Sequence, residues 1–289
     1  MHRKPDFMII GAMKCATSTL QKQLSLQPGI FMTTPKEPNF FSDDDIYAQG
    51  IDWYASLYQS AGAGDLIGEA STHYTKQPTY PHTLERLQQH CGNDLKLIYI
   101  IRNPIDRLIS HYMHEWSMRN IDCSLVAALD SNPELVSYSQ YYRQIKPYLD
   151  AFGRRNVLLL CHERLAAEPA EQLAIAAEFI GYGRPTTWID SESRQNVSAE
   201  RIRKFPGYDF VVNTPMLEHL RRRLVPRAIR DAIKQRLQMT ARPRLDDSSR
   251  QRLAQIFDQD LGCLGELLGE SVACASYPEF SRKARHVWI

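Results

Sequence analysis

The sequence predicts an α/β fold in which helices cover both faces of a mainly parallel sheet of about five strands. Short apolar runs, typical of buried strands, alternate along the chain with segments of helical periodicity. A helix between two such strands returns the chain to the same end of the sheet, which makes the strands parallel. Beyond about residue 185 the strand pattern stops, and helical patterns predict a helical carboxyl-terminal extension.

The predicted strands are short and apolar. Four of them lie at 7–10 (FMII), 65–70 (DLIGEA), 95–101 (LKLIYII) and 156–161 (NVLLLC). A weaker fifth, GIFMT, lies at 29–33. Helical patterns, several of them behind a proline, lie at 17–26, 80–90, 105–118, 138–152, 170–180, 215–238 and 246–269.

The chain has 289 residues, 43% of them hydrophobic, which is enough for one domain with a sizeable core. We therefore expect a single domain over 1–289, with an α/β core at 7–182 and a mostly helical extension with a terminal loop at 183–289. The net charge of +2 is too small to predict nucleic-acid binding, so any anion site must come from a local cluster.

The amino terminus predicts a cytoplasmic protein. Its basic start is followed by only a very short apolar stretch before Lys14, which is too little for a signal peptide or a membrane span. The six cysteines show no CxxC spacing, and a chain of this size needs no disulfides to fold. We expect mostly free thiols, with a bridge between Cys263 and Cys274 as the alternative.

The segment GAMKCATSTL at 11–20 has the position of a phosphate-binding loop, between a strand and a helix. Backbone N–H groups and the helix dipole favour an anion there, Lys14 adds a charge, and Thr17, Ser18 and Thr19 add hydroxyl donors. A Walker A motif would place its lysine directly before the hydroxyl residue, whereas Lys14 stands three residues before Thr17. A magnesium-nucleotide P-loop is therefore disfavoured, and an ordinary capped turn is the alternative.

The strand at 95–101 runs directly into Arg102, and Pro104 then opens a helix that carries Ser110 about two turns further on. An arginine at the end of a strand can reach a second phosphate near the first turn, because its planar fork of donors matches phosphate oxygens. The alternative is a salt bridge at the helix start between Arg102 and Asp106.

The segment TTPKEPNFF at 33–41 places Glu37 between a lysine and a proline, close to two aromatic residues. A carboxylate in such a loop can be held rigidly and partly desolvated, which would raise its basicity and suit a general base. A plain surface turn is the alternative.

Together these segments resemble the nucleotide-dependent sulfotransferase family, especially its bacterial members and the heparan-sulfate-type sulfotransferase domains. GAMKCATSTL resembles the family's 5′-phosphosulfate loop, IYIIRNPIDRLISHY its 3′-phosphate motif, KEPNFF its K-E-P-H-F-F segment, and GEASTHY its E-K-T/S-P-x-Y turn. SYSQYYRQIKPYLDAFGRRNVLLLCHERL resembles a later helix-strand unit, with Tyr141 facing the nucleotide. The resemblance keeps the family's order from residue 7 to about residue 182.

The resemblance implies a P-loop-like fold and metal-free sulfuryl transfer from 3′-phosphoadenosine 5′-phosphosulfate (PAPS), with adenosine 3′,5′-bisphosphate (PAP) as the product. Lys14 would neutralise the leaving 5′-phosphate, Glu37 would take the acceptor's proton, and Arg102 with Ser110 would bind the 3′-phosphate. The remaining implied nucleotide contacts are Cys15, Ala16, Thr17, Ser18, Thr19 and Tyr141, with Arg282, Lys283 and Arg285 from the terminal segment SRKAR.

The sequence departs from the family pattern at three places. Ala16 stands where a glycine is usual, and a left-handed conformation there would cost about 1–2 kcal/mol. Asn39 replaces a histidine, and Ala70 replaces the lysine of the E-K-T/S-P-x-Y turn, so that a second catalytic cation is missing. Residues that could contact the acceptor or replace that cation are Lys36, Asn39, Phe40 and His73.

Other function classes stay open at this point. A P-loop small-molecule kinase or NTPase would share the architecture but would need the Walker A lysine. The arginine-rich stretch at 218–238 could instead bind an acidic polymer or a membrane surface, although such a stretch is more often a solvated helical face. We expect no nucleic-acid partner. The acceptor could be a hydroxyl or amine of a carbohydrate, a lipid-linked molecule or a small molecule, and an anionic glycan or lipid is included. Peripheral membrane association and the oligomeric state are also open.

Overall fold

The computed structural model describes residues 3–192, 203, 239, 241–283 and 285–289. A five-stranded sheet with the order β2-β3-β1-β4-β5 lies at its centre, and every pair of neighbouring strands is parallel. The strands are β1 (Phe7–Gly11), β2 (Ile30–Met32), β3 (Leu66–Ala70), β4 (Lys96–Ile101) and β5 (Val157–Cys161). All five predicted strands are confirmed, and the sheet is wholly parallel.

Most of the predicted helices are present. They are α1 (Thr17–Ser25), α4 (Thr83–His90), α5 (Pro104–Ser117), α8 (Tyr141–Phe152), α10 (Pro169–Phe179) and α14 (Asp247–Leu268). The predicted helix at 215–238 lies outside the described residues. Shorter helices that the periodicity did not predict are α2 (Asp44–Tyr47), α3 (Gly50–Ser56), α6 (Leu125–Ser131), α7 (Glu134–Ser137), α9 (His162–Ala167) and α15 (Tyr277–Phe280), with 3-10 turns η1 (Thr72–Thr75), η2 (Arg154–Asn156) and η3 (Asp190–Glu192).

The start of α8 shows why sequence periodicity alone misplaces a helix end. The pattern predicts a helix from residue 138, but α8 begins at Tyr141. The carboxylate of Asp260, from α14, accepts hydrogen bonds from the N–H groups of Tyr142 (2.9 Å) and Arg143 (3.0 Å). A side chain more than a hundred residues away therefore caps the first turn of α8.

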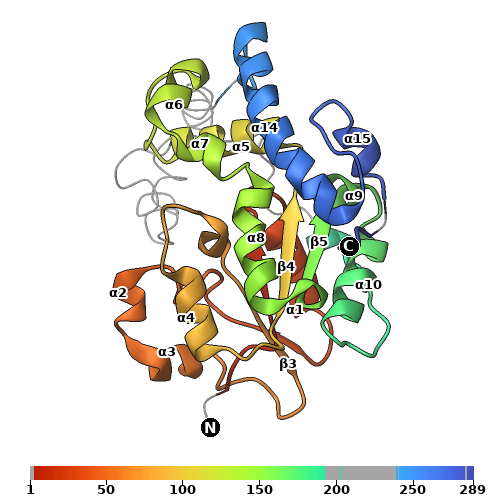
Figure 1. Ribbon diagram of the computed structural model, residues 1–289. Coiled ribbons are helices and arrows are strands. Elements are labelled where there is room, and N and C mark those ends of the chain that lie inside the picture. The colour runs from red at the N-terminus through yellow and green to blue at the C-terminus, as the bar shows by residue number, and fades with distance from the viewer. Residues whose placement is uncertain (1–2, 193–202, 204–238, 240, 284) are drawn as a thin grey trace, which may run out of the picture.

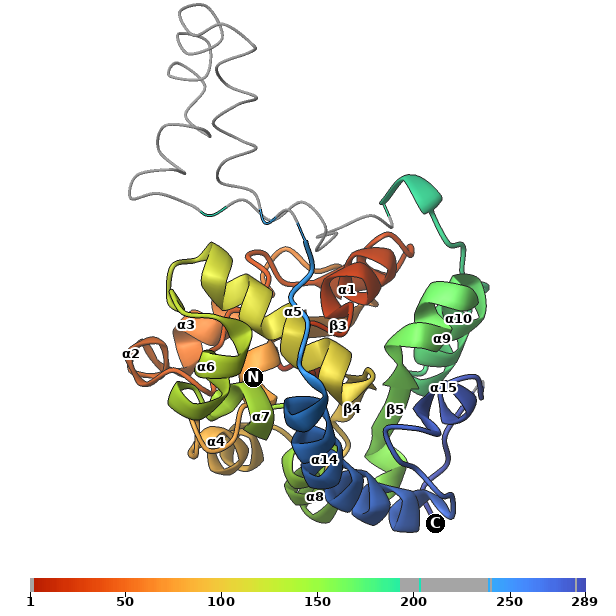
Figure 2. The same cartoon turned by 90° about the horizontal axis from the view of Figure 1, so that it is seen from above.

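Helices cover both faces of the sheet. Figure 1 shows α8 in front of β4 with α1 behind it, and Figure 2 shows α8 and α14 on the side opposite α1. Helices α1 and α10 pack against each other, as do α4 and α8, and α14 packs on α8 and α5. Leu253 and Phe257 of α14 are buried among apolar residues of α5 and α6, so the carboxyl-terminal helix completes a second part of the core.

The order of the strands determines where a ligand can bind. From β1 the chain passes to β2 and β3 on one side of the sheet and then crosses to β4 and β5 on the other. In doubly wound sheets the ligand crevice opens at this reversal, beyond the carboxyl ends of the strands. Here the reversal lies between β1 and β4, whose carboxyl ends lead into the loop after Gly11 and into Arg102.

Two further findings concern expectations drawn from composition. All six cysteines are free thiols, so the alternative bridge between Cys263 and Cys274 is not formed. Among the helices of the described ranges, none combines the length and the apolar character that crossing a bilayer requires.

Candidate functional site

The loop after β1 begins at a glycine that has no room for a side chain. A Cβ atom on Gly11 would lie 2.0 Å from Oγ1 of Thr75 and 2.9 Å from the ring of Tyr99. The next amide, on Ala12, donates a hydrogen bond to the carbonyl oxygen of Ile100 in β4 (2.8 Å). The loop is therefore clamped between η1 and β4, with its remaining residues at the carboxyl edge of the sheet.

Ala16 adopts a left-handed backbone conformation, which glycine takes more easily than alanine. Its backbone is left-handed, with φ 66° and ψ 23°, and Lys14 is also left-handed with φ 72°. Ala16 serves as the N-cap of α1, and its carbonyl oxygen accepts from the N–H groups of Thr19 (3.0 Å) and Leu20 (3.1 Å). The first amide groups of α1 have no partner within the helix, and an anion suits them.

Cys15 contributes to this loop through its backbone. Its side chain is fully buried, and burial raises the pKa of the thiol to about 12. The thiol therefore stays protonated at neutral pH and is no nucleophile. Of the three hydroxyl residues that follow, Thr17 is buried, while Ser18 and Thr19 are partly exposed in the first turn of α1.

Arg102 joins the end of β4 to the phosphate loop. Its guanidinium Nη1 donates a hydrogen bond to the carbonyl oxygen of Lys14 (3.4 Å). The Tyr141 hydroxyl donates to the carbonyl oxygen of Arg102 (2.7 Å) and lies 3.3 Å from the Arg102 amide nitrogen, which donates to it. The predicted 5′- and 3′-phosphate segments therefore meet at one edge. Tyr141 is buried and supports Arg102, so its direct contact with a nucleotide stays a prediction.

The helix after Arg102 begins as the sequence predicts. The Asn103 side chain accepts from the N–H groups of Ile105 (3.1 Å) and Asp106 (3.2 Å), with Pro104 in the first turn of α5. Asp106 pairs with Arg242 at 2.5 Å, so the alternative salt bridge to Arg102 gives way to a partner from the extension. Ser110 follows on α5 and is 4% exposed.

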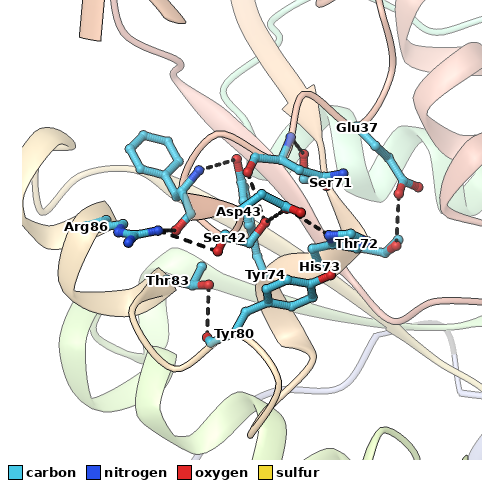
Figure 3. A network of polar contacts seen from close by, with 12 residues as sticks. Glu37, Ser42, Asp43, Ser71, Thr72, His73, Tyr74, Tyr80, Thr83 and Arg86 are labelled. Atoms are coloured by element: carbon cyan, nitrogen blue, oxygen red, sulfur yellow. Dashed lines mark hydrogen bonds and ion pairs between the residues drawn. The ribbon is translucent and has the colours of Figure 1, made fainter. Parts of the chain in front are cut away.

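Glu37 lies at the end of the neighbouring strand β3. Its backbone is left-handed (φ 58°), and its N–H donates to the carbonyl oxygen of Ala70 (3.0 Å). The Thr72 hydroxyl donates to the Glu37 carboxylate (3.2 Å), and the Lys36 ammonium pairs with the same carboxylate. Figure 3 shows Glu37 pointing down to Thr72 from the loop above it.

The expected rise in the basicity of Glu37 is wrong for this arrangement. Burial acts to raise its pKa, but the charge and hydrogen bond of Lys36, with the charges of Lys76 and His73, outweigh it and hold the pKa below its usual value. The Glu37 carboxylate is partly desolvated as expected, but the cations around it, Lys36 above all, lower its pKa more than burial raises it. The carboxyl group is therefore ionised at neutral pH.

A histidine and an aspartate lie beside Glu37. Nδ1 of His73 lies 3.0 Å from the Asp43 carboxylate, and the imidazole ring stacks on Tyr80 with centroids 4.5 Å apart. Figure 3 shows the contact between His73 and Asp43 next to Thr72. The Asn39 side-chain oxygen is buried without a hydrogen-bond partner in the described part of the chain. His73 and Asn39 therefore lie near Glu37, and their contact with an acceptor stays a prediction.

Phe40 does not line this site. It is 1% exposed, and its ring stacks on Tyr54 with centroids 4.7 Å apart. The expectation that it contacts an acceptor is wrong, because its ring packs into an aromatic cluster with Phe41 and Tyr54. Tyr54 and Tyr58 are buried in the same region, and packing is their role.

Sequence reasoning missed Lys76. This lysine directly follows η1 and is partly buried, and burial lowers its pKa to about 8 despite the nearby charge of Glu37. Its position two residues after the GEASTHY segment was the available signal. A lysine in a loop without apolar periodicity gives no sign of burial, because tertiary packing from α5 creates its surroundings.

The terminal basic segment lies at the edge strand β5. His286 forms an antiparallel bridge with Leu159, Lys283 pairs with Glu270, and Arg285 lies 3.5 Å from Glu178. The carbonyl oxygen of Arg282 accepts from Arg164 (2.7 Å). In this structure Lys283 and Arg285 are paired with carboxylates, so the contact of this segment with a nucleotide stays a prediction.

Among the described residues, no three or more His, Cys, Asp or Glu side chains are grouped so that they could hold a metal ion. His111 and Glu115 illustrate this. Burial lowers the pKa of His111 to about 3, and its Nε2 lies 3.4 Å from the Glu115 carboxylate as a helix pair. The two side chains stabilise α5.

Comparison with known proteins shows which family this chain belongs to. Residues 4–258 match the sulfotransferase domain. The chain belongs to the sulfotransferase family. Mouse heparan sulfate glucosamine 3-O-sulfotransferase 3B1 is 27% identical over 195 residues, which cover 63% of this chain and 47% of that protein. The membrane-associated sulfotransferase kil1 of Dictyostelium discoideum is 37% identical over 121 residues, 40% of this chain and 24% of that protein. The chain spans about half the length of the heparan sulfate relatives it matches.

Solved sulfotransferases share the fold. The crystal structure of a sulfotransferase from Alicyclobacillus acidocaldarius has a TM-score of 0.66 and 23% identity, covering 93% of this chain and 98% of that one. Mouse sulfotransferase SULT7A1, crystallised with PAP, has a TM-score of 0.52 and 14% identity, covering 96% and 90%. The sulfotransferase match contains Lys14, Glu37, Arg102 and Ser110, whereas residues 281–285 lie beyond it.

Proposed function

We propose that this protein is a PAPS-dependent sulfotransferase that sulfates a hydroxyl or amine of a carbohydrate, lipid-linked or small-molecule acceptor. The observation that carries the proposal is that the loop of Lys14, the side chain of Arg102 and the loop of Glu37 all lie at the carboxyl edge of the sheet. Arg102 donates to the carbonyl of Lys14, and Glu37 is held at the end of β3. The family and the PAP complex of a mouse sulfotransferase with the same fold support this choice of donor.

The residues at this edge fit such a donor. Loop amides and the start of α1 provide N–H groups, the hydroxyls of Thr17, Ser18 and Thr19 follow, and Lys14 supplies a positive charge. We assign these groups to the 5′-phosphate, and Arg102 with Ser110 to the 3′-phosphate. When bound, the donor supplies a sulfuryl group attached to a phosphate that is a good leaving group. In the transfer the bond between sulfur and the phosphate oxygen breaks, and a bond between sulfur and the acceptor oxygen or nitrogen forms. The protein's share of the catalysis is then positioning and charge stabilisation.

Glu37 is our choice for the base that takes the acceptor's proton. Its low pKa keeps it ionised and able to accept a proton, and Thr72 and Lys36 hold its orientation. A weak base still helps when the proton leaves late in the reaction, and general base catalysis is typically worth about 10²- to 10⁴-fold. Lys36 then has two roles, as the counterion of Glu37 and as a group able to contact the acceptor.

Space for an acceptor lies beside the pair of His73 and Asp43. A cavity of ≈ 480 Å³ is lined by Ser42, Asp43, Asp44, Asp45, Ile46, Thr79, Tyr80, Pro81 and His82. Three carboxylates line this cavity, and of these only Asp44 pairs with an arginine, Arg86, within the described part of the chain. The remaining negative charge favours a hydroxyl or amine group over a sulfated or phosphorylated one, since like charges repel. We therefore place a neutral or amine-bearing part of the acceptor there, whatever charge the rest of it has.

One experiment tests the donor and the base together. Labelled sulfate from PAPS is offered with an extract of candidate acceptors to the wild type, to Glu37→Gln and to Glu85→Gln, a matched change on the exposed face of α4. We expect transfer by the wild type and by Glu85→Gln and a loss of at least 100-fold in Glu37→Gln. Equal transfer by both variants would reject Glu37 as the base.

Nucleotide binding separates the alternatives. A sulfotransferase binds PAP without magnesium, whereas a kinase or NTPase of the P-loop class binds magnesium-ATP. Retention on an anionic polymer without any affinity for PAP would favour the non-enzymatic binder that the stretch at 218–238 suggests.

A further inference from the structure

Lys76 lies at the end of a turn that contacts both halves of the proposed site. It directly follows η1, whose Thr72 hydroxyl binds the Glu37 carboxylate and whose Thr75 hydroxyl donates to the carbonyl oxygen of Ile10 (2.8 Å), one residue before the phosphate loop. The backbone of Lys76 is tied into the same turn, because its N–H donates to the carbonyl of His73 (3.1 Å). The turn therefore holds this lysine near both the base and the loop.

Among the described residues, none provides a counterion in contact with the ammonium group of Lys76. Within the described part of the chain it makes no hydrogen bond or ion pair, and it lies 5.9 Å from the centroid of the Tyr138 ring. By contrast, Lys36 pairs with Glu37 and Lys146 pairs with Asp150. A partly buried ammonium without a bound anion carries an uncompensated desolvation cost, which a bound anion would remove.

Charged and titratable groups surround Lys76 from three sides. They are Glu37 and Asp43 from the loops after β2, His73 from η1, Arg107, His111 and Glu115 from α5, and the ring of Tyr138. Burial and Arg107 act to lower the pKa of Lys76, and the carboxylates oppose them. The resulting pKa of about 8 leaves the lysine mostly charged at neutral pH.

We propose that Lys76 binds the sulfuryl oxygens of the donor and supplies the second cation that the site lacks at Ala70. The inference rests on the proposed sulfotransferase function. Lys14 is assigned to the leaving phosphate and Glu37 to the acceptor, and the turn carrying Lys76 connects the segments that hold these two residues. A cation at this position neutralises charge on the group that passes between them.

Equilibrium binding tests the proposal without turnover. The affinities of PAPS and of PAP are measured by calorimetry, without acceptor, for the wild type, Lys76→Met and Lys76→Arg. PAP lacks the sulfuryl group, so we expect Lys76→Met to bind it like the wild type. The same variant should bind PAPS about 10- to 100-fold more weakly, the loss typical of a hydrogen bond between charged groups. Lys146→Met, which removes a lysine from an exposed ion pair on α8, is the control and should change neither affinity.

The pH dependence gives a second readout. Above pH 8 the wild type should lose its affinity for PAPS as Lys76 deprotonates, while its affinity for PAP stays level. Lys76→Arg should keep its PAPS affinity over the same range, because a guanidinium stays charged.

The outcomes separate this inference from the proposed function. If the wild type binds neither PAP nor PAPS, the proposed sulfotransferase function fails, and the inference fails with it. If the wild type binds both and Lys76→Met binds PAPS equally well, the inference alone is overturned. Equal loss of PAP and PAPS affinity in Lys76→Met would assign the lysine a structural role and would also overturn it.

Discussion

The hydroxyl of Tyr141 is hydrogen-bonded to both backbone atoms of Arg102, at 2.7 Å to the carbonyl oxygen and 3.3 Å to the amide nitrogen. This contact ties the first residue of α8 to the end of β4, where the guanidinium of Arg102 reaches the carbonyl of Lys14. The position of the arginine that we assign to the 3′-phosphate is therefore supported by a buried side chain from the next crossover helix.

Removing this hydroxyl should weaken nucleotide binding at a distance. In Tyr141→Phe the partly buried backbone groups of Arg102 lose their partner, so we expect a stability loss of about 1–3 kcal/mol and a several-fold weaker affinity for PAP. Tyr142→Phe, one residue along, is the matched control. Chemical unfolding and calorimetry measure the two effects, and an unchanged PAP affinity in Tyr141→Phe would show that Arg102 needs no such support.

Arg102→Ala should discriminate between nucleotides. Loss of a charged hydrogen bond to the 3′-phosphate costs about 1.5–3 kcal/mol, which is a 10- to 150-fold weaker affinity for PAP. Adenosine 5′-phosphate, which lacks the 3′-phosphate, should bind the variant and the wild type alike. If both nucleotides lose affinity equally, Arg102 serves the loop and not the 3′-phosphate.

Lys36→Met should raise the pKa of Glu37. Lys36 is the largest of the influences that lower this pKa, and burial, which raises it, would dominate once the ammonium is removed. An ionised base is needed for the reaction, so the acidic limb of the profile of kcat/KM against pH should move to higher pH. Lys22→Met, at the surface partner of Glu192, is the control. A limb that stays in place in Lys36→Met would mean that another group determines it.

The buried carboxyl group of Glu69 should make the fold less stable as the pH rises. Burial raises its pKa from 4.5 to about 7, with hydrogen bonds from Tyr54 and other tyrosines opposing the shift. Between these two values the folded state retains a proton that the unfolded state has lost, so stability falls as the pH rises from about 4.5 through 7. The total is on the order of 3 kcal/mol. Glu69→Gln should remove most of this slope in thermal unfolding scans, whereas an equal slope in the variant would assign it to other groups.

Prediction from the sequence succeeded where local signals and short-range geometry suffice. The five strands are short, mostly apolar runs, and β1 and β5 are buried along their whole length. The left-handed Ala16 lies in a loop that must turn sharply into α1. The three segments to which the sequence assigns the phosphate loop, the 3′-phosphate contact and the base all lie at the carboxyl edge, because parallel strands all end there. Their roles stay predictions.

Prediction failed where a distant residue decides the environment. Phe40 looked like an acceptor contact, but Tyr54 and its neighbours bury the ring. Glu37 looked like a carboxylate of raised basicity, but the bound Lys36 reverses the sign of its pKa shift. The start of α8 moved by three residues, to Tyr141, in a structure where Asp260 caps its first turn.

The sequence by itself determined the sulfotransferase fold and the order of the motifs, because strand patterns and strand-to-helix turns are local properties of the chain. Only the tertiary structure decided which charges meet. Lys76 lies near Glu37 because η1 packs against the end of β1, and its altered pKa arises from burial beside α5. Such a contact depends on distances across the fold, and no pattern along one segment of the sequence encodes it.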